Sequence, residues 1–223
     1  MSELAGVRDV DHPTYGRIKV FGGNDVVSRH VEGGAEWERH LIDIAIPHVR
    51  PGYDVVDAGA NLGFFALGLL AAGGRPRRVH CFEPRADAMA LLQHNVEDRP
   101  EIVTYGFGLS DRTRMPPYEK TLDNVGGTRI GLGSRHRCAT LALDSVRTLF
   151  EAPVSLVKID VEAHELELLL GARRFFAEHR PELILIESFE ENHAAVDAEL
   201  VRLGYVLRER HGRWDHVYER AAK

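Results

Sequence analysis

Apolar and polar positions alternate between strand-like and helix-like patterns from about residue 53 onwards. Short apolar runs predict strands, and the segments between them place apolar residues at helical spacing. We expect strands at 54–57, 78–83, 102–109, 154–160, 182–187, 205–210 and 215–220, and helices at 64–72, 86–96, 165–177 and 193–203. This alternation indicates an α/β fold, and the last two strands form a local hairpin about His211 and Gly212. The prediction is a seven-stranded, mostly parallel sheet with one antiparallel strand and helices on both faces.

Two regions lie outside this alternation. Residues 1–50, with a strand at 15–21 and a helix at 35–49, predict an extension that packs on a core domain at 51–223. Trp37 in that helix either closes over a ligand or packs the helix, and we favour packing. Residues 112–137 are rich in glycine and proline and predict an insertion that forms a functional loop or a small hairpin. Its Asn124, Arg129, Arg135 and Arg137 could bind a substrate phosphate or carboxylate, although a solvated loop explains them equally well.

Composition excludes several classes of protein. The chain has 223 residues, 28 Lys and Arg against 34 Asp and Glu, and two cysteines. The net charge of −6 argues against a protein that coats nucleic acid, and no basic stripe with interleaved aromatic residues is present. Two cysteines give neither a disulfide framework nor a cysteine-based zinc motif. Without a signal-peptide pattern or a bilayer-length apolar run, we expect a cytoplasmic protein. The sequence does not indicate an oligomeric state.

A glycine-bearing turn, Asp57-Ala-Gly59-Ala-Asn61-Leu-Gly63, joins the first core strand to the first core helix. Glycine lets the backbone approach a ligand closely, and a helix N-terminus offers free amide groups. Glu83 ends the next strand, where a carboxylate can accept hydrogen bonds from both ribose hydroxyls of a nucleoside. These residues predict an adenosine-containing cofactor at the carboxyl edge of the sheet. A tight turn without a ligand is the alternative.

Charge separates two such cofactors. A dinucleotide would bring a negative pyrophosphate to Asp57, and its usual Gly-x-Gly-x-x-Gly spacing is replaced here by Gly-x-x-x-Gly. S-adenosylmethionine carries an ammonium and a sulfonium group, which a carboxylate attracts. The turn therefore favours the methyl donor.

The densest group of reactive side chains is Lys158-Ile-Asp160-Val-Glu162-Ala-His164-Glu165, after the fourth core strand. Period-two alternation places Lys158, Asp160 and Glu162 on one side of the strand end, where open α/β sheets bind ligands. Carboxylates and an imidazole there can act as general bases, and the carboxylates can bind a hard cation. Glu165 is better explained as a first-turn acid that complements a helix dipole.

Together these motifs resemble the FkbM family of S-adenosylmethionine-dependent methyltransferases. The resemblance covers about Trp37 to Tyr205. It rests on the turn at 57–63, Phe82-Glu83-Pro84, Leu109-Ser110-Asp111, Thr140-Leu-Ala-Leu-Asp144, Pro181 to Glu187 and, most specifically, Lys158 to Glu165. It implies a class I methyltransferase (Rossmann-like) fold and methyl transfer, usually to a hydroxyl oxygen of a sugar or polyketide-type natural product.

The resemblance also implies residue roles. The residues that would contact the cofactor are Asp57, Gly59, Asn61, Gly63 and Glu83, with Ser110 and Asp111 near its adenine. Those that would face a small-molecule acceptor are Asp160, Glu162 and His164, and the insertion at 112–137 would be the loop that covers this acceptor. The family usually has glycine where this chain has Ala163, so a methyl group narrows the conformations of the loop that carries His164.

For a hydroxyl acceptor, the protein must align the oxygen with the methyl group and remove its proton. We expect His164 or Asp160 to take that proton while Glu162 orients the base or binds an acceptor hydroxyl. Alternatively, Asp160, Glu162 and Glu187 hold Mg²⁺, which would lower the pKa of the hydroxyl.

Two other function classes stay open. One is an NAD-dependent oxidoreductase or epimerase, against which Asp57 and the glycine spacing argue. The other is a nucleoside-binding module without catalysis, against which the intact acids at 160, 162 and 165 argue.

Overall fold

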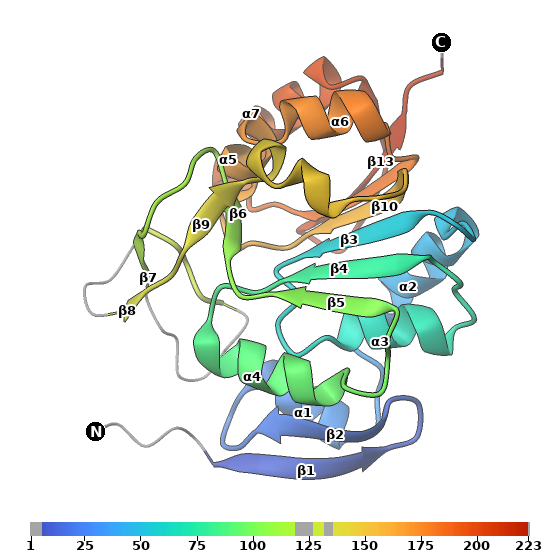
Figure 1. Cartoon of the computed structure of the whole chain (residues 1–223), viewed down its shortest axis with the longest axis vertical. Coiled ribbons are helices and arrows are strands. Elements are labelled where there is room, and N and C mark those ends of the chain that lie inside the picture. Colours follow the sequence, from blue (N-terminus) through green and yellow to red (C-terminus); the bar gives the residue numbers. More distant parts are fainter. Residues whose placement is uncertain (1–5, 119–126, 132–135, 223) are drawn as a thin grey trace.

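The computed structural model describes residues 6–118, 127–131 and 136–222, and seven of its strands form one central sheet. In spatial order these are β12 (Tyr205–His211), β13 (Asp215–Arg220), β11 (Leu183–Glu187), β10 (Val154–Ile159), β3 (Asp54–Ala58), β4 (Arg78–Phe82) and β5 (Ile102–Tyr105). β13 runs antiparallel to both of its neighbours, and the other neighbouring pairs are parallel. The predicted sheet, with its one antiparallel strand, is confirmed (Figure 1).

Helices cover both faces of this sheet (Figure 1). One face carries α2 (Arg39–Ala45), α3 (Phe64–Ala71) and α4 (Ala86–Asn95), and the other carries α5 (Glu165–Leu170), α6 (Arg173–His179) and α7 (Glu190–Arg202). Successive strand residues point to opposite faces, so both must be apolar. Val55 and Leu156 accordingly pack on the first side, and Val56 and Val157 on the second. Short 3-10 turns occur at η1 (Ile46–His48), η2 (Leu143–Ser145) and η3 (Arg147–Leu149).

The N-terminal residues form an antiparallel hairpin, β1 (Val7–His12) and β2 (Gly16–Phe21), followed by α1 (Val26–Glu32). Asn95 of α4 binds the backbone of Lys19 through both its amide nitrogen and its oxygen, at 3.0 and 2.6 Å. Tyr15 stacks on Phe64 of α3, with ring centroids 5.3 Å apart. These contacts seat the hairpin on α3 and α4.

Three elements differ from the sequence-based prediction. The helix expected at 35–49 is shorter, because Glu38 has a positive φ of 51° and α2 begins only after it. The strand expected at 102–109 divides, and β6 (Gly108–Ser110) leaves the sheet to pair with β9 (Thr140–Ala142). The helix expected at 165–177 breaks at Gly171, where a Cβ atom would collide with the carbonyl oxygen of Ser110. In addition, α1 was not predicted.

The inserted segment is described only in part. It contains the short strands β7 (Pro117–Tyr118) and β8 (His136–Arg137), while Asn124 and Arg135 lie outside the described residues. Arg137 donates a hydrogen bond to the carbonyl oxygen of Met115 at 2.8 Å.

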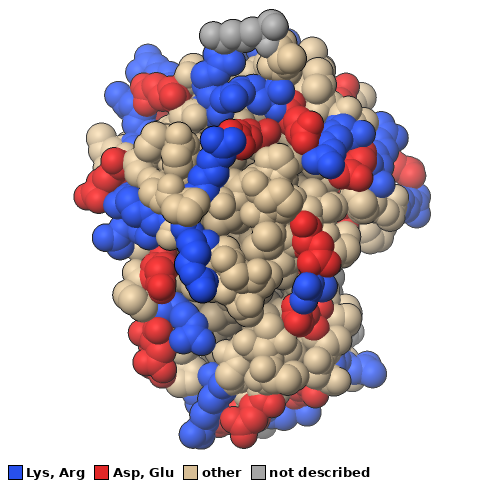
Figure 2. Space-filling view, turned by 90° about the vertical axis from the view of Figure 1, so that its right-hand side faces the viewer, with Lys and Arg blue, Asp and Glu red and all other residues tan. Residues whose placement is uncertain are grey.

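The edge at which the parallel strands begin faces the viewer in Figure 2. Acidic and basic side chains surround an uncharged area there (Figure 2). The candidate site described below lies at the opposite edge, where these strands end. Within the described ranges, none of the helices has the length and apolar character needed to cross a bilayer.

Candidate functional site

A cavity of about 210 Å³ opens at the carboxyl ends of β3, β4, β10 and β11. Of the residues proposed from the sequence, it is lined by Gly59, Asn61, Glu83, Asp160, Glu162 and Glu187. Asp57, Gly63, Ser110, Asp111 and His164 are not among its lining residues. The structure therefore gathers one part of the proposed site around the cavity and places the other part behind it.

The turn between β3 and α3 depends on its glycines. Gly59 and Gly63 have φ values of 84° and 88°, in the left-handed region that favours glycine. A Cβ atom on Gly59 would collide with the carbonyl oxygen of Asp160, and the Asp160 amide donates a hydrogen bond to the Ala58 carbonyl at 2.9 Å. Gly59 thus lets the turn and the acidic loop after β10 meet at the cavity.

Glu83 holds this turn from the end of β4. Its two carboxylate oxygens accept hydrogen bonds from the backbone amides of Asn61, at 2.9 Å, and Arg85, at 2.8 Å. Burial raises the pKa of Glu83 to about 7, against the effect of these two amides. The carboxyl group is fixed at the cavity wall, where a cofactor ribose would need it.

Asp57 lies deeper, on β3, and is fully buried. Burial raises the pKa of Asp57 to about 6, while the charge of Lys158 opposes that shift. One of its carboxylate oxygens has no hydrogen-bond partner among the described residues. Asp57 on β3 and Lys158 on β10 are neighbours in the sheet, so the negative charge of Asp57 acts mainly on that lysine.

Lys158 is a buried cation of the site, from the end of β10. Its ammonium nitrogen lies 3.3 Å from Oε2 of Glu38 and 3.2 Å from Oδ2 of Asp160, and 5.5 Å from the centre of the Phe65 ring. Burial alone would lower the pKa of Lys158, but Glu38, Asp160 and Asp57 together raise it well above its ordinary value. Lys158 is therefore a fixed positive charge that orients Asp160.

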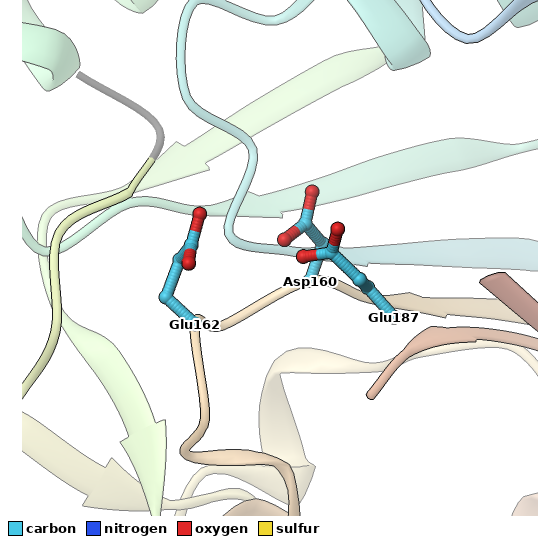
Figure 3. A group of neighbouring side chains, drawn as sticks. All are labelled: Asp160, Glu162 and Glu187. Atoms are coloured by element: carbon cyan, nitrogen blue, oxygen red, sulfur yellow. The ribbon is translucent and has the colours of Figure 1, made fainter. Parts of the chain in front are cut away.

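Asp160, Glu162 and Glu187 form an acidic triad at the cavity wall (Figure 3). One oxygen from each carboxylate lies within 4.8 Å of the others. Burial, followed by the charge of Asp160, raises the pKa of Glu162 to about 7 and that of Glu187 to about 9. At neutral pH, Glu187 therefore keeps its proton, and Glu162 is close to its midpoint.

The loop that presents Glu162 is strained. Glu162 and Ala163 have φ values of 53° and 70°, so two consecutive residues with side chains occupy the left-handed region. The Glu165 carboxylate accepts a hydrogen bond from the Ala163 amide at 2.9 Å, and Asn192 donates to the Ala163 carbonyl at 3.2 Å. Glu165 is fully buried and stabilises this loop, in addition to being an acidic residue in the first turn of α5.

His164 lies with Ser110 and Asp111 behind this loop. Its Nε2 is 2.9 Å from Ser110 Oγ, which donates to Asp111 at 3.1 Å. Burial lowers the pKa of His164, although Glu167, 3.7 Å from its Nδ1, opposes that shift. This trio connects the acidic loop to β6.

Several lining residues were not predicted from the sequence. Glu38 comes from the N-terminal region and has no motif of its own; its only signal is that a buried Lys158 needs a partner. Arg85 holds Asp87 with two guanidinium nitrogens, at 2.9 and 3.0 Å, and Thr128 of the inserted segment at 2.8 Å. Trp37 lies just before α2, packs against the core as we favoured and lines the cavity, while its closure over a ligand stays a prediction.

The sequence around this cavity matches a known family. Residues 57–207 match the methyltransferase FkbM domain. Two curated proteins are similar: the AMB antimetabolite synthetase AmbE of Pseudomonas aeruginosa, 29% identical over 163 residues, and the hexuronic acid methyltransferase AglP of Haloferax volcanii, 26% identical over 137 residues. The alignments cover 54% and 60% of this chain, but only 8% of AmbE and 56% of AglP.

Among solved structures, methyltransferase FkbM from Methylobacillus flagellatus superposes with a TM-score of 0.56 at 24% identity. The superposition covers 75% of this chain and 43% of that one. The shared architecture is the class I methyltransferase fold expected from the sequence.

Proposed function

Because the chain belongs to the FkbM methyltransferase family, we propose that it transfers the methyl group of S-adenosylmethionine to a hydroxyl oxygen of a sugar or polyketide-type small molecule. The observation that carries the proposal is one cavity lined both by Glu83 with the glycine turn and by the acidic triad. A methyl donor bound between them would have its reactive carbon beside groups that can orient and deprotonate a hydroxyl.

The charge at the cavity supports this cofactor. Acidic side chains from Glu38, Glu83, Asp160 and Glu162 line it beside the protonated Glu187, with Lys158 and Arg85 as lining cations. Such a wall favours the sulfonium and ammonium groups of S-adenosylmethionine and disfavours the pyrophosphate of a dinucleotide. Asp57 lies behind the wall, where its negative charge stabilises the positive charge of the buried Lys158.

We assign the general base to Glu162. Its pKa of about 7 leaves a large ionised fraction at neutral pH, which is what a general base needs. Asp160 is a weaker candidate because Lys158 pairs with one of its carboxylate oxygens. Glu187 is also weaker, because it is protonated at neutral pH and cannot accept a second proton. In this proposal His164, paired with Ser110 away from the cavity wall, positions the loop and does not act as the base.

Mg²⁺ is a second proposal for the triad. Three carboxylate oxygens within 4.8 Å of one another form a donor set that suits a hard divalent cation, which would offset their mutual repulsion. When bound there, the ion would lower the pKa of the acceptor hydroxyl. Unchanged methyl transfer after exhaustive EDTA treatment would exclude this role.

AglP supports a sugar-type acceptor, because its name states that it methylates a hexuronic acid. We propose a small-molecule acceptor rather than nucleic acid, on the net charge of −6 and the absence of a basic stripe in the sequence.

A transfer assay tests the proposal. The protein is incubated with S-adenosylmethionine carrying a labelled methyl group and a panel of glycosides, uronic acids and hydroxylated macrolides. We expect the label in a methyl ether that survives mild alkali, and a loss of about 100-fold or more in turnover for Glu162→Gln. S-adenosylhomocysteine binding without transfer to any member of the panel would favour the nucleoside-binding module instead.

A further inference from the structure

An aromatic and basic surface adjoins the acidic triad at the end of β11. Glu187 of the triad ends this strand, and Phe189 follows two residues later. The Ser188 amide donates a hydrogen bond to the Trp214 carbonyl at 2.9 Å, which places the turn between β12 and β13 against this strand end. Trp214 and Phe189 therefore lie beside the triad although they are 25 positions apart in the chain.

The side chains of this surface contact one another, and the planes of the Phe189 and Trp214 rings are inclined by 60°. The ring centroids of Phe189 and Trp214 are 5.5 Å apart, and the guanidinium carbon of Arg129 lies 5.1 Å from the Phe189 centroid. Trp214 is 41% exposed, and it is the aromatic member among the exposed large hydrophobic residues that the structure describes. An exposed indole offers a flat apolar face to the ring of a ligand.

Arg129 is only weakly engaged by the side chains that the structure describes. It pairs with Glu191 at 4.0 Å, between side chains that are 41% and 63% exposed, where such pairs contribute little. Arg137 of the same inserted segment, by contrast, is bound to the Met115 carbonyl. Arg129 also lowers the pKa of Glu162, so its charge reaches the triad.

We propose that Arg129, Phe189 and Trp214 form an acceptor subsite that binds a ring bearing a carboxylate. The ring lies against Phe189 and Trp214, the carboxylate pairs with the planar guanidinium fork of Arg129, and a ring hydroxyl faces Glu162. A singly charged carboxylate fits better than a phosphate, because Glu190 and Glu191 begin the adjoining helix α7. This subsite rests on the proposed function, since it supplies the acceptor of that reaction.

The test compares two probes that differ in one group. Calorimetric titration of protein saturated with S-adenosylhomocysteine measures the affinities of p-nitrophenyl β-D-glucuronide and p-nitrophenyl β-D-glucoside. We expect the glucuronide to bind about tenfold more tightly, because its carboxylate gains a charge-assisted pair. Arg129→Gln should remove that preference, Arg129→Lys should retain part of it, and Trp214→Ala should weaken both probes alike.

Arg137→Gln is the matched control, because this arginine belongs to the same segment and is engaged elsewhere; it should keep the wild-type preference. Equal affinities for the two probes, binding of neither, or a preference that survives Arg129→Gln would each overturn the subsite. Binding of S-adenosylhomocysteine is measured in the same preparations. If the wild-type protein binds this cofactor product but the subsite test fails, only the subsite is wrong. If the wild-type protein does not bind it, the proposed function itself fails.

Discussion

The ammonium nitrogen of Lys158 lies 3.3 Å from a carboxylate oxygen of Glu38, so a core strand and the N-terminal region meet at the candidate active site. Burial raises the pKa of Glu38 to about 7, in opposition to Lys158, which favours its ionised form. The pair fixes the lysine that orients Asp160. Residues before the matched family domain therefore help to build the site.

Removing the lysine charge of this pair should weaken both the fold and the site. Lys158→Met leaves the buried carboxylates of Glu38 and Asp160 without their cation, and we expect a loss of about 3 kcal/mol in the free energy of unfolding. Denaturant titration at pH 8 measures this change. Asp43→Asn, an exposed position on α2 that pairs with Arg39, should change stability by less than about 0.5 kcal/mol. Equal stabilities for Lys158→Met and Asp43→Asn would contradict the importance of the buried pair.

Replacing Ala163 with glycine should make the folded protein more stable. Its φ of 70° costs a residue with a side chain about 1 kcal/mol, and glycine avoids that cost. Ala163→Gly should therefore raise the unfolding midpoint by about 2–4 °C. Ala177→Gly, an exposed position inside α6, should lower it by a similar amount because glycine is a poor helix former. A fall in midpoint for Ala163→Gly would show that the left-handed backbone is not strained here.

The rate of methyl transfer should depend on the ionisation of Glu162. With a pKa of about 7, its basic form increases as pH rises, so turnover should increase through pH 7 and level off above about pH 8. Initial rates across neutral pH, from about 5.5 to about 9, provide the profile. In Glu162→Gln the rise at pH 7 should disappear along with most of the activity. If the Glu162→Gln enzyme kept the rise in turnover near pH 7, that rise would come from the ionisation of another group.

Stability should fall as pH rises. The folded-state pKa values of Glu162 and Glu187, about 7 and about 9, exceed the value of 4.5 of an unperturbed glutamate. The folded protein thus binds these protons more tightly, and the stability that they contribute is complete below pH 4.5 and lost as pH passes 7 to 9. The unfolding midpoint of the ligand-free protein should decline across about pH 6–9, and Glu187→Gln should make the decline shallower. An unchanged slope in Glu187→Gln would show that this carboxyl does not titrate in that range.

The strands and the two sequence motifs at the cavity could be predicted because they depend on local patterns. The apolar run of β10, for example, indicates a buried strand without reference to the rest of the chain. The breaks in the predicted elements have a different origin. Gly171 ends a predicted helix because its neighbour is the Ser110 carbonyl, and β6 leaves the sheet to pair with β9. Both outcomes are set by packing between segments far apart in the chain.

Long-range packing also decided the composition of the site. Asp160, Glu162 and Glu187 were predicted together and line one cavity, because parallel strands end at the same edge. His164, only two residues from Glu162, is turned toward Ser110 by two consecutive left-handed residues. Glu38 could not be predicted, since its role arises from the fold of the N-terminal region over the sheet.

Thermal unfolding with S-adenosylhomocysteine, and with NAD⁺ as the control, tests the central claim most directly. At about one hundred times its dissociation constant, a ligand that binds only the folded state adds about 2.7 kcal/mol. For a domain of this size the midpoint should rise by about 5–10 °C with S-adenosylhomocysteine and stay constant with NAD⁺. No shift with S-adenosylhomocysteine, or a shift with NAD⁺ alone, would contradict the assignment of the cavity to the methyl donor.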